Sequence, residues 1–290
     1  MVCYPTQENL EPTAIWTYER FIVRHDQGAD AWKSDCAFAP YQRGRCMPSA
    51  QEPYCRNLLL KAMPPADLDL LKPVLERVKL EREQVLVEAG KPIEHLFFLE
   101  GGIASVISEL PDTSPTEIGI FGCEGLSGPG AILGTDSAST KTFMQVDGAG
   151  AMRIAVEDLR AAAAKSASLQ AVLLKYIQTV LTQVSHCAVS NANHHMEARL
   201  ARWLLMCHDR VDGDEIALTH HFMSLMLSAQ RSGVTVTLHI LEGVGAIRST
   251  RGLVRIIDRV KLEDLAGDAY GVPEAEYRKL IGRFGRPGDN

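Results

Sequence analysis

Short apolar runs separated by turn-forming residues dominate the first half of the chain. Runs at residues 85–87, 96–99 and 103–107 are separated by glycines, and more glycines follow up to residue 150. Runs of this kind predict short β-strands. Many short strands with regular turn signals indicate an antiparallel sandwich or jelly roll.

Residues 166–195 carry one long apolar stripe with helical spacing. Its members follow one another by threes and fours, as in the seam of a coiled coil. We therefore expect a long helix that forms the axis of a homodimer. The predicted seam consists of Leu169, Leu173, Tyr176, Val180, Val184 and Cys187.

A helix-turn-helix pattern occupies residues 218–243. Thr219 can cap a short first helix. In the second helix, Val234, Leu238 and Leu241 recur at i, i+4 and i+7 and are expected to face the first. The opposite side is the one that a DNA major groove would meet, and it carries Arg231, Ser232, Thr235 and Val236.

A β-hairpin is expected next, with a tight turn at residues 250–252. Arg248, Arg251 and Arg255 would flank its tip. Arginine suits phosphate and guanine recognition because its fork of donors is planar and always charged. The predicted DNA-contacting residues are Thr219, Gln230, Arg231, Ser232, Thr235, Arg248 and Arg251.

Composition narrows the possible classes of protein. The 290 residues have a formal net charge of −6, so any DNA binding must come from a local basic patch. No apolar run approaches the ~20 residues of a membrane span, and the N-terminus lacks the layout of a secretory signal. We expect a cytoplasmic protein with no membrane partner. No nucleophile elbow, Walker loop or zinc spacing is present, so we expect no enzyme and no metal site.

Residues 1–46 show no sustained period and stay unassigned, either as a flexible arm or as a segment upstream of a true start at Met47. The seven cysteines predict reduced thiols. Cys36, Cys46 and Cys55 could join Cys123 as ligands of an iron-sulfur cluster, although their spacing is looser than in the usual cysteine runs.

With these elements in this order, the sequence resembles the Crp/Fnr superfamily of bacterial transcription regulators over roughly residues 57–270. The resemblance is most specific in PIEHLFFLEGGIAS, in CEGLSG, and in ARLARWLLMCHDR leading into LTHHFMSLMLSAQRSGVTVTLHILEGVGAIRSTRG. It implies an α+β fold. The expected parts are a cyclic-nucleotide-binding-like β-roll at 47–165, a dimerisation helix at 166–195, a winged helix-turn-helix at 196–270 and a C-terminal tail at 271–290.

In family members that bind cyclic nucleotides, a Gly-Glu corner holds the ribose and an Arg-Ser or Arg-Thr pair holds the phosphate. The matching positions here are Glu124 and Gly125, and Lys141 and Thr142. Lysine lacks the bidentate fork of arginine, so the pocket departs from the family pattern. The sequence predicts no cofactor with certainty, and a cyclic nucleotide stays open as a candidate ligand of this pocket. Val236 stands where some members carry a base-contacting arginine, so we expect a different target sequence.

These observations predict a homodimeric, sequence-specific transcription regulator that binds an inverted repeat in double-stranded DNA and is controlled by an effector at the β-roll. RNA polymerase is a further candidate partner. Two alternatives stay open. One is a small-molecule sensor that acts through protein contacts, and the other is an iron-sulfur or thiol redox sensor.

Overall fold

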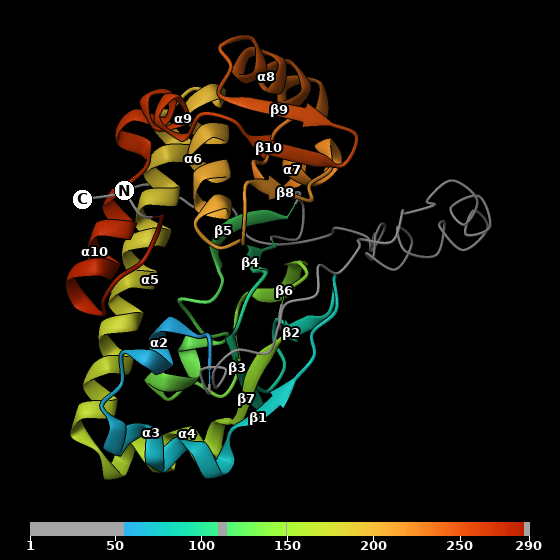
Figure 1. Cartoon of the computed structure of the whole chain (residues 1–290). Helices are drawn as coiled ribbons and strands as arrows, with labels where there is room; N and C mark the ends of the chain where they lie inside the picture. The colour runs from blue at the N-terminus through green and yellow to red at the C-terminus, as the bar shows by residue number, and fades with distance from the viewer. Residues whose placement is uncertain (1–54, 110–114, 149, 287–290) are drawn as a thin grey trace, which may run out of the picture. The chain divides into compact units, whose positions relative to one another are not determined.

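Two antiparallel sheets form the first half of the described chain, and side chains from both share one core (Figure 1). The computed structural model describes residues 55–109, 115–148 and 150–286. The predictions for residues 1–46, Met47, Cys36 and Cys46 lie outside these residues. The expected α+β class with an antiparallel β-roll is confirmed.

One sheet has the order β1-β7-β3 and the other β2-β6-β4-β5. Leu99 and Ala151 from the first sheet pack with Ala104, Phe121 and Met144 from the second. The alternation of strand side chains therefore builds a core between the sheets, as the short apolar runs predict. The strand bounds are β1 Glu76–Val78, β2 Val85–Val87, β3 His95–Leu99, β4 Ile103–Ser108, β5 Thr116–Phe121, β6 Lys141–Val146 and β7 Ala151–Ala155.

Helices lie beside the strands of the β-roll, at the left and below them in Figure 1. The longest is α5, which begins after Ser166; the Ser166 hydroxyl caps it by accepting a hydrogen bond from the amide of Leu169. The bounds in this region are α2 Leu58–Lys61, α3 Pro65–Leu71, η2 Lys72–Val74, η3 Pro129–Leu133, α4 Val156–Lys165 and α5 Ala167–Asn193.

The predicted dimer seam lies on the wrong face of α5, because its residues face the core of their own chain. Leu169, Leu173 and Tyr176 are buried in the core of their own chain, and Cys187 is buried as well. The remaining two, Val180 and Val184, line a cavity of the β-roll. Apolar residues lie on more than one side of α5, and the most continuous stripe packs within its own chain.

The C-terminal half contains the expected winged helix-turn-helix. Thr219 caps α7 by accepting a hydrogen bond from the amide of Phe222, as predicted. The wing strands β9 and β10 pair in antiparallel register, and β8 joins the other edge of β10. The bounds are α6 Met196–His208, β8 Glu215–Ile216, α7 His220–Met226, α8 Arg231–Gly243, β9 Ile247–Thr250, β10 Leu253–Ile256, α9 Arg259–Ala266 and η4 Gly267–Ala269.

The expected tail at 271–290 is wrong for residues 272–286. These residues contain helix α10, Val272–Leu280, which packs along α5 (Figure 1). Tyr277 and Phe284 are buried in the same core as Leu169. Tyr277, Leu280, Ile281 and Phe284 recur at i, i+3, i+4 and i+7, a helical spacing that the expectation of a tail did not use. Among the described residues, no helix is long and apolar enough to cross a membrane.

A buried polar network connects the β-roll to α6. The Glu117 carboxylate on β5 accepts hydrogen bonds from the indole nitrogen of Trp203 at 2.6 Å and from the Ser105 hydroxyl at 2.8 Å. Burial raises the pKa of Glu117 from 4.5 to about 7, and the two hydrogen bonds only partly oppose this shift.

This network predicts a pH-dependent stability. Folded Glu117 keeps its proton up to a pH of about 7, whereas the unfolded chain releases it near 4.5. The free energy of unfolding should therefore fall as pH rises through this interval, by up to about 3 kcal/mol, and then level off. Glu117→Gln should remove this component. Urea denaturation between pH 4.5 and 8 measures it, with exposed Glu109→Gln as the control. Parallel pH curves for the wild type and Glu117→Gln would contradict the assignment.

Candidate nucleic-acid interface and cavity

Helix α8 has a buried apolar face that packs on its own domain and an exposed face that carries both polar and apolar side chains. Val234, Leu238 and Leu241 are buried in the domain core, as the sequence predicts. Arg231 and Ser232 are exposed on the opposite side, at the N-terminal end of the helix. Farther along, the exposed face carries Val236, His239 and Ile240, and the Val236 side chain is 59% exposed.

Thr235 lies on this face but is partly engaged within the domain. Its hydroxyl donates a hydrogen bond to the carbonyl oxygen of Arg231 at 3.0 Å and lies 3.1 Å from Nδ1 of His220. Because the hydroxyl proton is already used, Nδ1 of His220 must be the donor in the second contact. Burial and nearby Arg231 lower the pKa of His220, which favours the neutral ring. His220 Nε2 then faces the hydroxyl of Ser249 on β9 at 3.5 Å, which links α7, α8 and the wing.

The wing places exposed arginines near α8. Arg248 on β9 and Arg251 in the turn are both exposed, and Gly252 adopts φ 78°, a left-handed conformation that favours glycine in a tight turn. Arg255 lies 4.0 Å from the carboxylate of Glu215 and is therefore partly neutralised. The structure thus places Arg231, Arg248 and Arg251 on the exposed surfaces of adjacent elements. Thr219 and Gln230 lie at the starts of α7 and α8, and Gln230 is exposed.

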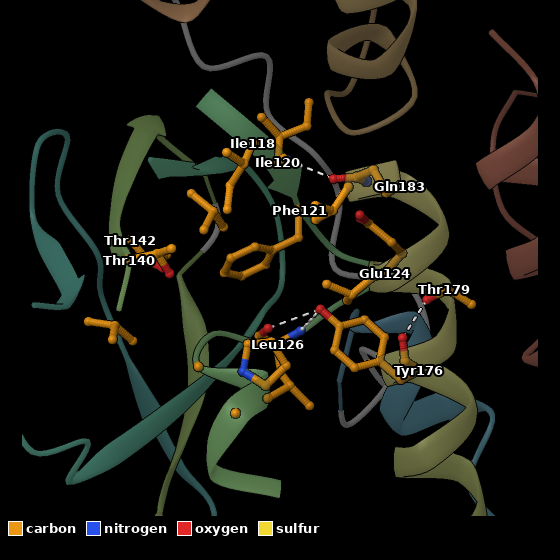
Figure 2. Close-up of a pocket in the computed structure, with 18 of the residues that line it drawn as sticks. Ile118, Ile120, Phe121, Glu124, Leu126, Thr140, Thr142, Tyr176, Thr179 and Gln183 are labelled. Carbon is orange, nitrogen blue, oxygen red and sulfur yellow. Dashed lines mark hydrogen bonds between the residues drawn. The ribbon is translucent and has the colours of Figure 1, made fainter. Parts of the chain in front are cut away.

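A cavity of about 340 Å³ lies between the β-roll and α5 (Figure 2). Phe121 projects into this space from β5 and Tyr176 from α5 (Figure 2). The Tyr176 hydroxyl is already satisfied, because it donates to the carbonyl oxygen of Leu126 and accepts from its amide. Most of the lining is apolar and includes Val87, Val106, Ile118, Ile120, Leu126, Val180 and Val184.

Only half of the predicted effector pocket lines this cavity. Glu124 and Thr142 do, whereas Gly125 and Lys141 do not. Successive side chains of a strand point to opposite faces. Lys141 is therefore directed away from its neighbour Thr142, and its ammonium group lies 3.9 Å from Glu88. At Gly125 an added Cβ would lie 2.5 Å from the Tyr176 hydroxyl, so this glycine makes room for the tyrosine.

Glu124 is held by a residue that sequence reasoning missed. Arg210, just beyond α6, forms a fully buried ion pair with its carboxylate at 2.8 Å. The Glu124 carboxylate also accepts a hydrogen bond from the amide of Gly122. Burial alone would lower the pKa of Arg210, but Glu124, Glu274 and Asp209 raise it above its ordinary value. Arg210 and four residues from the C-terminal segment, Pro273, Glu274, Tyr277 and Phe284, also line the cavity.

The described cysteines lack the properties of reactive thiols. Burial raises the pKa of Cys55 and of Cys123 to about 11, and it raises the pKa of Cys187 and Cys207 as well. The thiolate is the reactive and metal-binding form. Among the residues the structure describes, no group of three His, Cys, Asp or Glu side chains is placed to hold a metal ion. His194 instead contacts Asp268 at 2.9 Å.

A family profile described as the Crp-like helix-turn-helix domain matches residues 198–265. No curated protein sequence matches the chain. Among solved structures, a protein from Eubacterium rectale ATCC 33656, described as a Crp/Fnr family regulator, is similar with a TM-score of 0.57 and 16% identity over 72% of this chain and 97% of that one.

Two further structures have the same overall fold. A Crp-family regulator from Thermus thermophilus has a TM-score of 0.55 and 20% identity, with 66% of this chain and 96% of that one covered. The c-di-GMP responsive regulator CLP from Xanthomonas campestris has a TM-score of 0.52 and 15% identity, with 67% and 99% covered. This chain therefore contains a Crp-like helix-turn-helix domain within the fold of Crp/Fnr family transcription regulators.

Proposed function

We propose that this protein is a sequence-specific, DNA-binding transcription regulator that acts as a homodimer on an inverted repeat. The observation that carries the proposal is the exposed face of α8, with Arg231 and Ser232 at its start and the exposed wing arginines Arg248 and Arg251 on the adjacent hairpin. A helix of this kind fits the major groove, and the wing arginines contact phosphates. Such a regulator acts in the cytoplasm without catalysis of its own, and RNA polymerase is a further partner.

The apolar part of α8 has a role in specificity. Arg231 can form two hydrogen bonds with a guanine, and Ser232 can contact a base edge or a phosphate. Val236 cannot donate or accept, but its exposed methyl groups can pack against the methyl group of thymine. We therefore expect each half-site to combine a guanine contacted by Arg231 with a thymine contacted by Val236.

The dimer forms through the exposed face of α5, opposite the face that packs on the β-roll. Positions at alternating intervals of three and four residues are all exposed on this face. Leu174 and Leu181 are the large apolar residues among them, at 46% and 56% exposure. The other positions are small or uncharged, so two helices can approach closely. The stripe, which we call the exposed α5 stripe, consists of Ala171, Leu174, Gln178, Leu181, Ser185 and Ala188.

Effector control at the β-roll completes the proposal. The cavity of about 340 Å³ falls in the size range of small-molecule sites. A ligand bound there would contact α5, which also carries the exposed α5 stripe, so its occupancy can favour one arrangement of the dimer.

One observation favours a second function, in which the winged domain contacts a protein. Val236, Ile240 and Val244 form an exposed apolar line along α8, at 59%, 41% and 46% exposure. Such a line suits a protein groove as well as a run of thymines. The two functions differ in what Arg231 does, because only DNA binding requires its guanidinium group.

Selection of random duplex DNA by the purified protein tests the main proposal. An inverted repeat should be enriched, and its affinity should fall steeply with salt. Arg231→Ala should weaken binding to this site by about 10- to 100-fold, because a bidentate base contact contributes about 1–3 kcal/mol. Arg251→Ala should weaken binding to all sequences and reduce the salt slope by about one. Exposed Arg82→Ala, in the β-roll, is the control.

Folding of each variant is checked by thermal unfolding. If Arg231→Ala folds and still binds the enriched site with wild-type affinity, α8 is not the recognition helix. If no sequence is enriched but a protein partner is bound through α8, the second function replaces the first.

The dimer face is tested by a charge on the exposed α5 stripe. Leu181→Glu should give a monomer in analytical ultracentrifugation, because like charges would meet at the axis of a symmetric dimer. Exposed Leu133→Glu, on η3, should leave the mass unchanged. Leu173→Ala should lower the free energy of unfolding by about 2–5 kcal/mol, because Leu173 is buried in its own chain. Wild-type mass for Leu181→Glu would refute this face.

A further inference from the structure

The residues that follow the winged domain return to the β-roll. We call residues 272–286 the C-terminal strap. Its helix α10 lies along α5 (Figure 1), and Tyr277 and Phe284 pack against each other with ring centroids 5.1 Å apart. Both rings belong to the core of the β-roll. The strap is therefore covalently continuous with the winged domain and packed into the sensory one.

The strap forms part of the cavity wall. Pro273, Glu274, Tyr277 and Phe284 line it together with the α5 residues. The Tyr277 hydroxyl donates a hydrogen bond to the backbone carbonyl of Glu124 at 2.7 Å. The ring of Phe284 lies against the Arg210 guanidinium, with Cζ 5.0 Å from its centroid. A molecule in the cavity would thus lie beside a segment that belongs to neither the β-roll strands nor α5.

Arg286, at the C-terminal end of the strap, forms hydrogen bonds with the segment that connects α6 to β8. Arg286 donates hydrogen bonds to the carbonyl oxygens of His208 and Val211, both at 3.1 Å, and to that of Gly213. These three carbonyls belong to the segment that leads from α6 into the winged domain. One arginine therefore couples the position of the strap to the base of the DNA-binding domain.

The charges around the cavity select its ligand. Arg210 is the one cationic side chain among the described residues of the wall, and it is paired with Glu124. Glu274 adds a second buried carboxyl, and burial followed by nearby Asp209 raises its pKa. Lys141 is directed away and lies against Glu88. An anionic ligand would have no unpaired cation to meet there, and it would lose its hydration without compensation.

We propose that the cavity holds an uncharged, largely apolar small molecule, and that the C-terminal strap carries its presence to the winged domain. This inference rests on the effector control proposed above and names the ligand class and the route. An apolar ligand packs against the Tyr277 and Phe284 rings and holds the strap in place. Arg286 then fixes the 208–213 segment. The free energy of coupling is the difference in strap packing between the empty and the occupied cavity.

The first test uses the uncharged fluorophore N-phenyl-1-naphthylamine, which becomes bright in apolar sites. It should bind saturably, one molecule per chain, and cyclic AMP should not displace it. Val106→Phe fills the cavity from β4 and should weaken probe binding by roughly tenfold or more, about 1.4 kcal/mol. Val85→Phe is the matched control, because Val85 is exposed on β2 of the same sheet and does not line the cavity. Val180→Phe, on α5, fills the cavity from the other side if Val106→Phe does not fold.

The second test follows the route by hydrogen exchange. In the wild type, the probe should slow exchange in both the strap and residues 208–214. In Arg286→Ala, the probe should still bind and slow exchange in the strap, but the effect at 208–214 should be lost. Exposed Arg283→Ala, three residues away in the same segment, should behave as the wild type.

These outcomes separate the inference from the proposed function. Absence of saturable probe binding, or displacement of the probe by cyclic AMP, would overturn the ligand class. Protection of 208–214 that persists in Arg286→Ala would overturn the route. Neither measurement needs DNA, so a failure of DNA binding would count against the proposed function and leave the cavity and strap to be judged separately.

Discussion

The buried ion pair between Arg210 and Glu124 is the constraint on which the arrangement of this molecule depends. Removing two charges from water costs more than their attraction returns unless the remaining donors and acceptors are satisfied. Here they are satisfied by elements from across the chain. The amide of Gly122 comes from the β-roll, the carbonyl of Met206 from α6, and the ring of Phe284 from the strap. The pair therefore holds only while the three elements are together, and it specifies one geometry among the many that apolar packing alone would permit.

The same pair changes the chemistry of the cavity beside the β-roll. Family resemblance assigns Glu124 to a ribose, yet its carboxylate is occupied by a guanidinium from the start of the winged domain. A ligand that needed Glu124 would have to break this ion pair and leave the buried Arg210 without the carboxylate that it contacts. An apolar ligand makes no such demand, because it can occupy the space beside Phe121 and Tyr176 while the pair stays intact. The departure of Lys141 from the arginine of the family pattern is consistent with this, since its neighbour Thr142 faces the cavity and Lys141 does not.

Local patterns in the sequence predict the parts of this fold whose contacts are close in sequence. Val234, Leu238 and Leu241 are spaced for one buried face, and the Thr219 cap needs only a neighbouring amide, so the helix-turn-helix could be predicted correctly. The orientation of α5 could not be predicted. Leu173 and Leu181 are both leucines, and each belongs to a stripe of residues that recur every three or four positions. Only the shape of the β-roll decides which of them is covered. The spacing of Tyr277, Ile281 and Phe284 is a local signal for a helix, but it does not give the partner of that helix, because Tyr277 is anchored by Glu124, more than 100 positions away.

Because the protein is acidic overall, any attraction for DNA would depend on where its exposed arginines lie. With a net charge of −6, the overall field repels DNA, and only a patch within about one Debye length of the phosphates, ~8 Å at physiological salt, can attract it. Arg231 on α8 and Arg248 and Arg251 on the wing form such a patch only if helix and wing keep a fixed separation. His220 provides this constraint through its contacts with Thr235 and Ser249. Its lowered pKa favours the neutral ring, in which Nδ1 carries the proton for the contact with Thr235 and Nε2 is left as the acceptor that faces Ser249. Helix α8 and the wing hairpin are therefore held at a fixed separation by the contacts of one histidine on α7.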